Sequence, residues 1–229
     1  MKINNIKHIF FDLDHTLWDF DRNSALTFDK IFRLHQMEVD MTRFLSIYEP
    51  VNLDYWKLYR NSEIDKDKLR YGRLKDTFDR MECVISDERI YLLSEDYMTH
   101  LTTFNHLFEH TIDILDYLEP NYGLHIITNG FEDAQYRKMK GSNITHYFKT
   151  VTNAEMVGVK KPNSLIFDHA LRLANARPDE SIMVGDNYEA DILGALEVGY
   201  DAIFFNYRKD ESEAHIKQIN CLSELRKYL

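Results

Sequence analysis

The sequence predicts an α/β fold, a parallel sheet with helices on both faces, interrupted after its first strand by an all-helical insertion. Two observations predict the sheet: there are five short apolar runs, and from residue 124 onward amphipathic stretches alternate with them. One observation predicts the insertion. Between Asp21 and about Phe108 the chain shows helical spacing of apolar residues and no strand-like run.

The expected strands are short and apolar, as strands buried on both faces of a sheet usually are. They cover residues 7–11, 124–128, 150–153, 181–185 and 202–205. The helices expected between them cover residues 132–139, 164–174 and 188–197. Gly199 is a suitable stop for the last of these, because glycine commonly follows a helix.

The insertion is expected to contain four helices, over residues 24–35, 42–59, 65–81 and 87–107. Aromatic rings mainly bury area, so its aromatic residues favour a bundle core over a ligand-binding surface. These residues are Tyr48, Tyr55, Trp56, Tyr59 and Tyr71. The predicted domains are a core of residues 1–17 and 108–229 and a helical cap of residues 18–107.

Composition narrows the class of protein. No apolar stretch approaches the roughly 20 residues that span a bilayer, and the N-terminus lacks the pattern of a signal peptide, so we expect a cytoplasmic protein without a membrane partner. Cys83 and Cys221 have no ligand-like spacing. A net charge of −10 disfavours long nucleic acid as a partner. A small phosphorylated metabolite is not excluded, since a metal and a lysine can reverse the local field.

The first strand ends in acids: Ile9-Phe10-Phe11 is followed directly by Asp12-Leu13-Asp14-His15-Thr16. Open α/β sheets bind ligands at the carboxyl ends of their strands. Two carboxylates this close would repel by roughly 4 kcal/mol at an effective dielectric of about 20, unless a cation lies between them. The pattern therefore favours a metal site. The alternative is a turn in which Asp caps its own backbone.

Polar groups also follow the second and third strands. Thr128-Asn129-Gly130 combines a hydroxyl with backbone N–H groups at a glycine turn, which suits a phosphate; the alternative is a helix cap. Lys160 and Lys161 come next in the chain, and Pro162 restrains the backbone of Lys161. We expect one lysine to act at the site and the other to lie on the surface.

The fourth strand ends in Gly185-Asp186, and Asp191 follows on the next helix. A second acid at a strand end suits Mg²⁺, which binds a few hard oxygens and keeps several waters. Each signal is modest alone. Together they place acids, a hydroxyl and a lysine after successive strands of one parallel sheet.

These motifs, in this order, resemble the haloacid-dehalogenase-like hydrolase superfamily. The resemblance implies a Rossmann-like core with a cap inserted between the first two motifs. More narrowly, residues 127–131, 155–163 and 183–194 resemble the bacterial 5′-nucleotidases that favour pyrimidine nucleotides. In the insertion, Val51-Asn52 with Trp56 and Tyr71-Gly72-Arg73 resemble that branch too. Asn163-Ser164 departs from the pattern, since many relatives have a proline there; this affects a turn only.

The resemblance also implies a role for each core residue. Asp12 is the nucleophile that forms an aspartyl-phosphate. Asp14 protonates the leaving alkoxide and then activates water. Mg²⁺ is held by the side chains of Asp12 and Asp186 and by the backbone carbonyl of Asp14.

The remaining implied roles concern the phosphoryl group and the substrate. Thr128, the N–H of Asn129 and Lys161 bind the phosphoryl oxygens, where charge is stabilised. Asp191 positions Lys161 or a metal-bound water. In the cap, the candidates for substrate specificity are Asn52, Trp56 and Arg73.

The sequence is best interpreted as a Mg²⁺-dependent phosphomonoesterase acting through an aspartyl-phosphate on nucleoside 5′-monophosphates, as a monomer or weak dimer. Within the same class, a phosphatase of sugar phosphates or other small organic phosphates, and a mutase, stay open. From another class, the alternative is a non-hydrolytic phospho-acceptor or regulatory binding protein. A receiver domain is much shorter and lacks such an insertion, and a degenerate relative would have lost one of the acids or Lys161.

Overall fold

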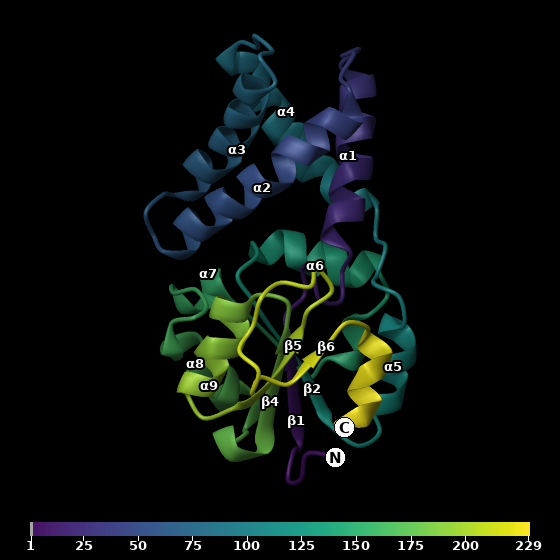
Figure 1. Cartoon of the computed structure of the whole chain (residues 1–229), viewed down its shortest axis with the longest axis vertical. Helices are drawn as coiled ribbons and strands as arrows, with labels where there is room; N and C mark the ends of the chain where they lie inside the picture. The colour runs from purple at the N-terminus through teal and green to yellow at the C-terminus, as the bar shows by residue number, and fades with distance from the viewer. Residues whose placement is uncertain (1) are drawn as a thin grey trace. The chain divides into compact units, whose positions relative to one another are not determined.

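The computed structural model describes residues 2–229, which form two compact units (Figure 1). The first unit combines the chain up to Phe20 with Asn105–Leu229, and the second is Asp21–Phe104. The first contains a parallel sheet with helices around it, and the second is helical. The predicted fold class is therefore confirmed.

The sheet has six strands in the order β3-β2-β1-β4-β5-β6, and all neighbouring strands are parallel. They are β1 (His8–Phe11), β2 (Gly123–Thr128), β3 (Thr150–Asn153), β4 (Ser181–Gly185), β5 (Asp201–Phe205) and β6 (Gln218–Ile219). β6 has no counterpart among the expected strands, because two residues carry no periodicity. Since β1 lies between β2 and β4, the direction of winding reverses beside β1, which is where sheets of this kind bind ligands.

Helices flank the sheet in the first unit (Figure 1). They are α5 (Thr111–Leu118), α6 (Glu132–Gly141), η2 (Thr145–Tyr147), α7 (Ala154–Val157), α8 (Ser164–Ala174), η3 (Pro178–Glu180), η4 (Tyr188–Leu193), α9 (Gly194–Glu197) and η5 (Leu222–Lys227). On one face, Phe10 of β1 belongs to a buried cluster with Phe167 of α8 and Ala195 of α9. Phe11 alternates to the opposite face, where its ring contacts that of Phe148.

Several helices of the first unit differ from expectation, and the short η2, α7, η3 and η5 have no counterpart among the expected ones. Residues 188–197, expected as one α-helix, form the π-helix η4 followed by the short α9. The expected stop is present, since Gly199 has φ +87°. α5 has no counterpart among the expected helices, because its short apolar pattern lies at the expected edge of the insertion.

The chain leaves and re-enters the first unit through two adjacent segments. Trp18 and Leu107 form an antiparallel bridge. The N–H of Asp19 donates to the carbonyl of His106 at 3.0 Å. The N–H of Phe108 donates to the carbonyl of Leu17, also at 3.0 Å. The two ends of the inserted segment are thereby fixed side by side within the sheet-containing unit.

The second unit contains α2 (Met41–Arg60), α3 (Lys66–Arg80), α4 (Asp87–His100), η1 (Leu101–Thr103) and most of α1 (Phe20–Leu34). The carboxylates of Asp40 and Asp65 and the hydroxyl of Ser86 cap α2, α3 and α4 by accepting backbone N–H groups. α4 ends earlier than expected, because η1 follows His100 and the backbone of Phe104 is extended.

Phe28 belongs to the core of the second unit, with the rings of Phe44, Tyr48 and Tyr97 4.6 to 4.8 Å away. Of the five aromatic residues expected in this core, only Tyr48 is fully buried, and the other four are half-buried. Tyr55, for example, donates its hydroxyl to Asp76 at 2.9 Å. The expectation of a shared aromatic core is therefore wrong for four of the five.

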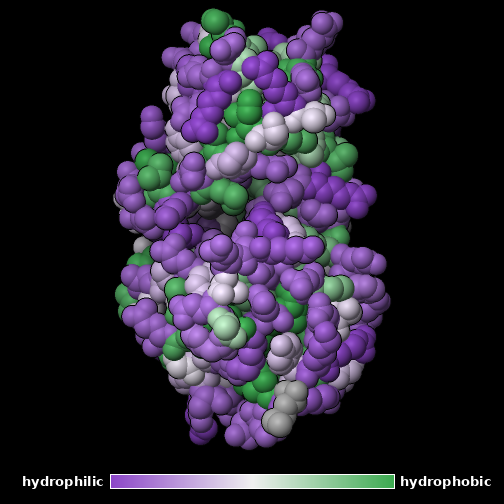
Figure 2. All heavy atoms as spheres, in the orientation of Figure 1, coloured by the Kyte–Doolittle hydropathy of each residue, from purple (hydrophilic) through white to green (hydrophobic). Residues whose placement is uncertain are grey.

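The surface in view is mostly hydrophilic, as the net charge of −10 leads one to expect (Figure 2). Across residues 2–229, no helix combines the length and the apolar character that a membrane crossing needs.

Candidate active site

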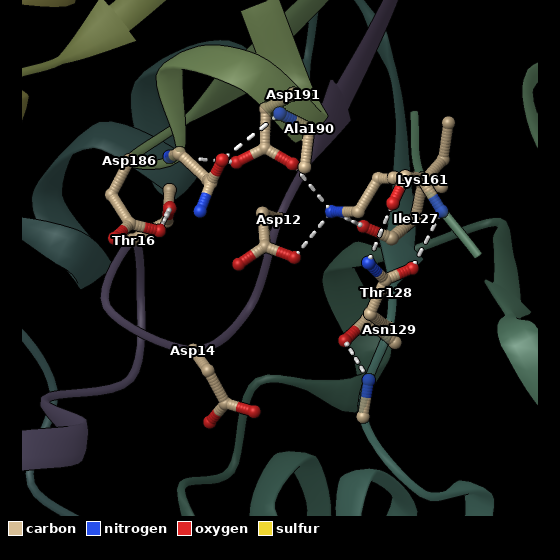
Figure 3. Close-up of polar contacts among 12 residues, drawn as sticks. Asp12, Asp14, Thr16, Ile127, Thr128, Asn129, Lys161, Asp186, Ala190 and Asp191 are labelled. Atoms are coloured by element: carbon tan, nitrogen blue, oxygen red, sulfur yellow. Dashed lines mark hydrogen bonds and ion pairs between the residues drawn. The ribbon is translucent and has the colours of Figure 1, made fainter. Parts of the chain in front are cut away.

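The carboxyl ends of β1, β2 and β4 bring the predicted core residues together (Figure 3). Asp12 directly follows β1, Thr128 ends β2, and Asp186 directly follows β4. Lys161 and Asp191 reach the same place from the segments after β3 and β4. Parallel pairing aligns these strand ends at one edge of the sheet, so residues far apart in sequence become neighbours.

Lys161 is the central cation of this group. Its Nζ donates to Asp12 Oδ1 at 2.6 Å and to the carbonyl of Ile127 at 2.7 Å, and it forms an ion pair with Asp191 at 2.7 Å. Three oxygens thus surround an ammonium that has three protons. Burial lowers the pKa of Lys161, but the charges of Asp12 and Asp191 outweigh it, and the net pKa is raised. The residue is therefore a fixed positive charge.

Asn129 joins the segment after β2 to the segment that carries Lys161. Its side-chain amide donates to the carbonyl of Lys161 at 3.0 Å, and its Oδ1 accepts the N–H of Lys161 at 2.7 Å. This pair of bonds fixes the backbone of the lysine. It leaves out the backbone N–H of Asn129, which is the group predicted to bind a phosphoryl oxygen. Lys160 is only half-buried, so the two adjacent lysines have different environments.

Three carboxylates lie together beside Lys161. One oxygen from each of Asp12, Asp186 and Asp191 lies within 4.8 Å of the others. Asp191 is brought close by the turn into η4, where its Oδ2 accepts the N–H of Asn187 at 3.0 Å. Gly185 makes room for it, since an added Cβ there would collide with Asp191 Oδ2. Any larger residue at position 185 would displace this carboxylate.

Burial and neighbouring charges raise the pKa of two of the three acids. Burial raises the pKa of Asp12 well above its usual range, and Asp191 and Asp186 add to the shift although Lys161 opposes it. Burial also raises the pKa of Asp186 to about 6. Within residues 2–229, the lysine and arginine contacts to the three carboxylates come from Lys161 and Arg208. The positive charge of His15 also lowers the pKa of Asp186, but burial outweighs it.

Thr128 is oriented by its neighbours. Its Oγ1 accepts the N–H of Gly130 at 3.1 Å and an amide N–H of Gln135 at 2.7 Å. A hydroxyl has two acceptor lone pairs and one proton, so these bonds leave the proton of Thr128 to be donated. Such a donor suits a phosphoryl oxygen.

Gly130 has a different role from the one expected. Among residues 2–229 the glycines with positive φ are Gly158 and Gly199, so the freedom of Gly130 to adopt unusual dihedrals is not used. The requirement at Gly130 is space, because an added Cβ would collide with the amide of Gln135. The conformational part of the sequence interpretation is wrong at this position.

Asp14 points away from Asp12 and from the other acids (Figure 3). Lys138 of α6 bonds both of its oxygens, at 2.6 and 2.8 Å, and Gln135 donates to its Oδ2 at 2.9 Å. The two acids of the segment after β1 thus have different environments. Asp12 and Asp186 share the crowded group, and Asp14 has a cation of its own.

Two of the three predicted specificity residues contact each other within the helical unit. Arg73 donates to Asn52 Oδ1 at 2.9 Å, and its guanidinium carbon lies 4.9 Å from the ring centroid of Tyr97. Arg73 is buried, and across residues 2–229 it forms no ion pair with a carboxylate. Trp56 is half-buried and packs edge-on against Tyr59 instead.

Comparison with known proteins places this site in a family. Residues 9–205 match the family of haloacid dehalogenase-like hydrolases. The match spans most of the chain and includes the three clustered acids, Thr128 and Lys161. The chain belongs to the haloacid dehalogenase-like hydrolases.

Two curated relatives and one solved structure illustrate the range of this family. The pyrimidine 5′-nucleotidase YjjG of Escherichia coli (strain K12) is 31% identical over 95% of this chain and 93% of its own length. The glyceraldehyde 3-phosphate phosphatase of Methanothermobacter thermautotrophicus is 31% identical over 91% and 89%. The crystal structure of the HAD-hydrolase YfnB from Bacillus subtilis, bound to magnesium, has a TM-score of 0.89 at 23% identity and covers 98% of both chains. This last likeness shows the fold.

The donor set of this haloacid dehalogenase-like hydrolase fits a hard divalent cation. Carboxylate oxygens are the ligands that Mg²⁺ and similar ions prefer. Asp12, Asp186 and Asp191 offer three of them within 4.8 Å of one another, and a bound cation would reduce the repulsion that Asp186 and Asp191 exert on Asp12. The cluster can therefore hold a metal.

Sequence reasoning missed three side chains that contact the predicted ones. Gln135 and Lys138 contact Asp14, and Arg208 donates to Asp186 Oδ2 at 3.2 Å. Gln135 and Lys138 have the spacing i, i+3 on α6, which puts both on one face of the helix. That spacing was the available signal, but polar residues at such positions usually lie on an exposed helix face.

Proposed function

We propose that this chain is a Mg²⁺-dependent phosphomonoesterase that works through an aspartyl-phosphate on Asp12, and that its substrates are nucleoside 5′-monophosphates. One observation carries the proposal. Asp12 sits between a buried lysine and two further carboxylates, while Asp14, two residues later, lies apart from them with its own cation. Two carboxylates with different partners can take different roles in one reaction, here as nucleophile and proton-transfer group.

In the first step, a carboxylate oxygen of Asp12 attacks the phosphorus and the bond from phosphorus to the ester oxygen breaks. Asp14 gives its proton to the leaving alkoxide. Lys161 and the hydroxyl of Thr128 stabilise the charge on the phosphoryl oxygens, together with the N–H of Asn129. The products are the alcohol and phosphorylated Asp12.

In the second step, Asp14 is a carboxylate and accepts a proton from water as the water attacks the same phosphorus. The bond between phosphorus and Asp12 breaks, which releases inorganic phosphate and restores the free carboxylate. Asp191 keeps Lys161 in place through both steps, as their ion pair at 2.7 Å supports.

Asp12 and Asp186 would hold Mg²⁺ through their side chains, and Asp14 through its backbone carbonyl. The ion, when bound, supplies positive charge for the phosphoryl oxygens and reduces the repulsion between an anionic substrate and the acids. The cluster of three carboxylates supports a divalent cation of this kind.

Substrate choice needs contacts beyond the phosphate, and we infer that the helical unit, residues 18–107 in the predicted division, supplies them as a cap. Its buried Arg73 has no carboxylate partner within the described residues, and Asn52 uses its Oδ1 to accept from Arg73 and from Tyr48. The amide N–H groups of Asn52 are then suited to a carbonyl oxygen of a base. The pyrimidine 5′-nucleotidase YjjG among the relatives supports a nucleotide.

A second candidate is a phosphatase of glyceraldehyde 3-phosphate or another small organic phosphate. The Methanothermobacter relative supports it, because it is as similar in sequence as YjjG is. Both candidates use the same core chemistry and differ only in what lies beyond the phosphate. In either case the partner is a small phosphorylated metabolite, and we retain the cytoplasm as the proposed location.

The test is phosphate release from a panel of nucleoside monophosphates, glyceraldehyde 3-phosphate and sugar phosphates, each with Mg²⁺ and with EDTA. We expect pyrimidine nucleotides to give the largest kcat/KM and EDTA to abolish turnover. The Asp12→Asn variant is the control for contaminating phosphatase. Faster hydrolysis of glyceraldehyde 3-phosphate than of any nucleotide would favour the second candidate, and turnover that persists in EDTA would contradict the metal requirement.

A further inference from the structure

Two side chains of α6 reach the segment after β1 and are enclosed there. Gln135 is 1% exposed and Lys138 is 3% exposed, although both lie on a helix whose other polar residues are largely at the surface. Burying an amide and an ammonium is unfavourable unless each is bonded. The Lys138 ammonium and the Gln135 amide nitrogen are bonded, whereas Oε1 of Gln135 is buried without a hydrogen-bond partner among residues 2–229.

Lys138 is fixed by its surroundings. Its Nζ bonds both oxygens of Asp14 and lies 4.7 Å from the ring centroid of Trp18 and 5.4 Å from that of Phe20. Aromatic faces attract a cation, and the contact is stronger where water is excluded. The ammonium thus has one favourable location, and the carboxylate of Asp14 is oriented against it.

Gln135 connects Asp14 to the hydroxyl of Thr128. Its amide nitrogen donates to Asp14 Oδ2 at 2.9 Å and to Thr128 Oγ1 at 2.7 Å, which uses both of its protons. The second bond makes Thr128 a donor, as its other lone pair accepts from Gly130. One side chain therefore sets the direction of two groups that act on the substrate in the proposed reaction.

We propose that Gln135 and Lys138 are positioning residues for the phosphatase reaction: Lys138 orients Asp14, and Gln135 fixes Asp14 relative to the hydroxyl of Thr128. This rests on the roles proposed above for Asp14 and Thr128. In this proposal Lys138 acts through the carboxylate of Asp14. The proposal assigns α6, which contains none of the predicted site residues, a part in the proton transfer.

The test is the Lys138→Met variant, with Lys140→Met as the matched control on the same helix, where Lys140 is exposed. The measured quantity is kcat/KM for two substrates: UMP, whose leaving group needs a proton, and p-nitrophenyl phosphate, whose leaving group does not. A misplacement of about 1 Å at a reacting group costs on the order of 100-fold. On this scale we expect Lys138→Met to lose about ten- to a hundredfold on UMP and less than about threefold on p-nitrophenyl phosphate, and Lys140→Met to match wild type.

A double-mutant cycle separates positioning from general damage. In an Asp14→Asn background, Lys138→Met should cost little more on UMP, because the group through which it acts is already neutral. Lys138→Arg should restore at least part of the UMP activity, since it retains a cation. Thermal unfolding of each variant shows whether the fold is kept.

Gln135→Leu tests the second arm. It removes the bond that makes Thr128 a donor, so we expect a loss on both substrates, with a rise in KM. An unchanged KM in Gln135→Leu would contradict this arm.

Two outcomes would overturn the role of Lys138: an equal loss of kcat/KM on both substrates, or an effect that adds fully to that of Asp14→Asn. Failure of the proposed function is distinguishable from either, because the Asp14→Asn variant alone would then show no preference between the two substrates.

Discussion

The ammonium of Lys161 and the carboxylate of Asp191 lie 2.7 Å apart, and each side chain is only 2% exposed. The two residues come from segments after different strands, β3 and β4, and the same ammonium also bonds Asp12. A buried ion pair is strongly dependent on both partners, since removing one leaves an uncompensated charge. The role proposed for Lys161 and the stability of the fold therefore depend on the same contacts.

Lys161→Ala should abolish phosphate release and lower the free energy of unfolding by about 3–5 kcal/mol, because Asp12 and Asp191 would lose their shared cation. Lys160→Ala is the matched control and should stay close to wild type in both. Urea unfolding and phosphate release measure the two effects. A variant series in which Lys160 is the essential residue would overturn the assignment of this motif.

Asp14→Asn should lower kcat/KM for an alkyl phosphate by roughly 10²–10⁴-fold, the usual range for removal of a general acid. The kcat/KM for an activated aryl phosphate should fall far less, since its leaving group departs without a proton. Steady-state kinetics on both substrates provide the comparison. Equal losses would show that Asp14 does not protonate the leaving group.

His125 should make stability fall in mild acid. Burial and the nearby His8 lower its pKa from 6.5 to about 4, so the folded state keeps it neutral over a range in which the unfolded chain binds a proton. The unfolded state then holds more protons, and the free energy of unfolding decreases as the pH falls from 6.5 to about 4, by up to about 3 kcal/mol. Urea unfolding of wild type and His125→Gln between about pH 7 and about pH 4.5 measures this.

The comparison between those two proteins matters, because Asp12 and Asp186 contribute in the opposite direction. Their raised pKa values mean that the folded state takes up protons before the unfolded chain does, which adds stability as the pH falls. Subtracting the His125→Gln curve removes this contribution. A difference between the two proteins that does not change with pH would contradict the prediction.

Substitutions in the helical unit should affect nucleotides selectively. Asn52→Ala and Arg73→Met are each expected to raise KM for a nucleoside monophosphate more than for p-nitrophenyl phosphate, by about tenfold for the loss of one good hydrogen bond. Arg80→Met, at an exposed arginine on the same helix as Arg73, is the control. Unfolding curves are needed alongside, because Arg73 is buried. Equal changes in KM for both substrates would argue against a role in specificity.

The strand-end residues could be predicted from sequence because each follows an apolar run directly. Asp12 and Asp186 follow β1 and β4, and parallel strands deliver such positions to one edge. Burial on both faces makes these runs short and continuous, which distinguishes them from helices. The order of the strands in the sheet is harder to predict in this way. The two residues of β6 give no sequence signal at all.

The supporting contacts could not be predicted, because they depend on tertiary placement. Gln135 and Lys138 look like ordinary polar residues of an amphipathic helix, and only the packing of α6 beside Trp18 and Asp14 encloses them. Arg208 follows β5 in a segment without periodicity. At Gly130 the sequence indicated a glycine requirement correctly but for the wrong physical reason.

The bridge between Trp18 and Leu107 has a consequence for how such a molecule can be rebuilt. The inserted segment departs and returns through neighbouring, hydrogen-bonded residues, so a short connection between them would not need to cut a strand. The sheet-containing unit therefore offers two adjacent points, Asp19 and His106, at which a different inserted segment would be joined. A helical segment of another length, joined at Asp19 and His106, would leave the strands, the clustered acids and Lys161 unchanged in sequence.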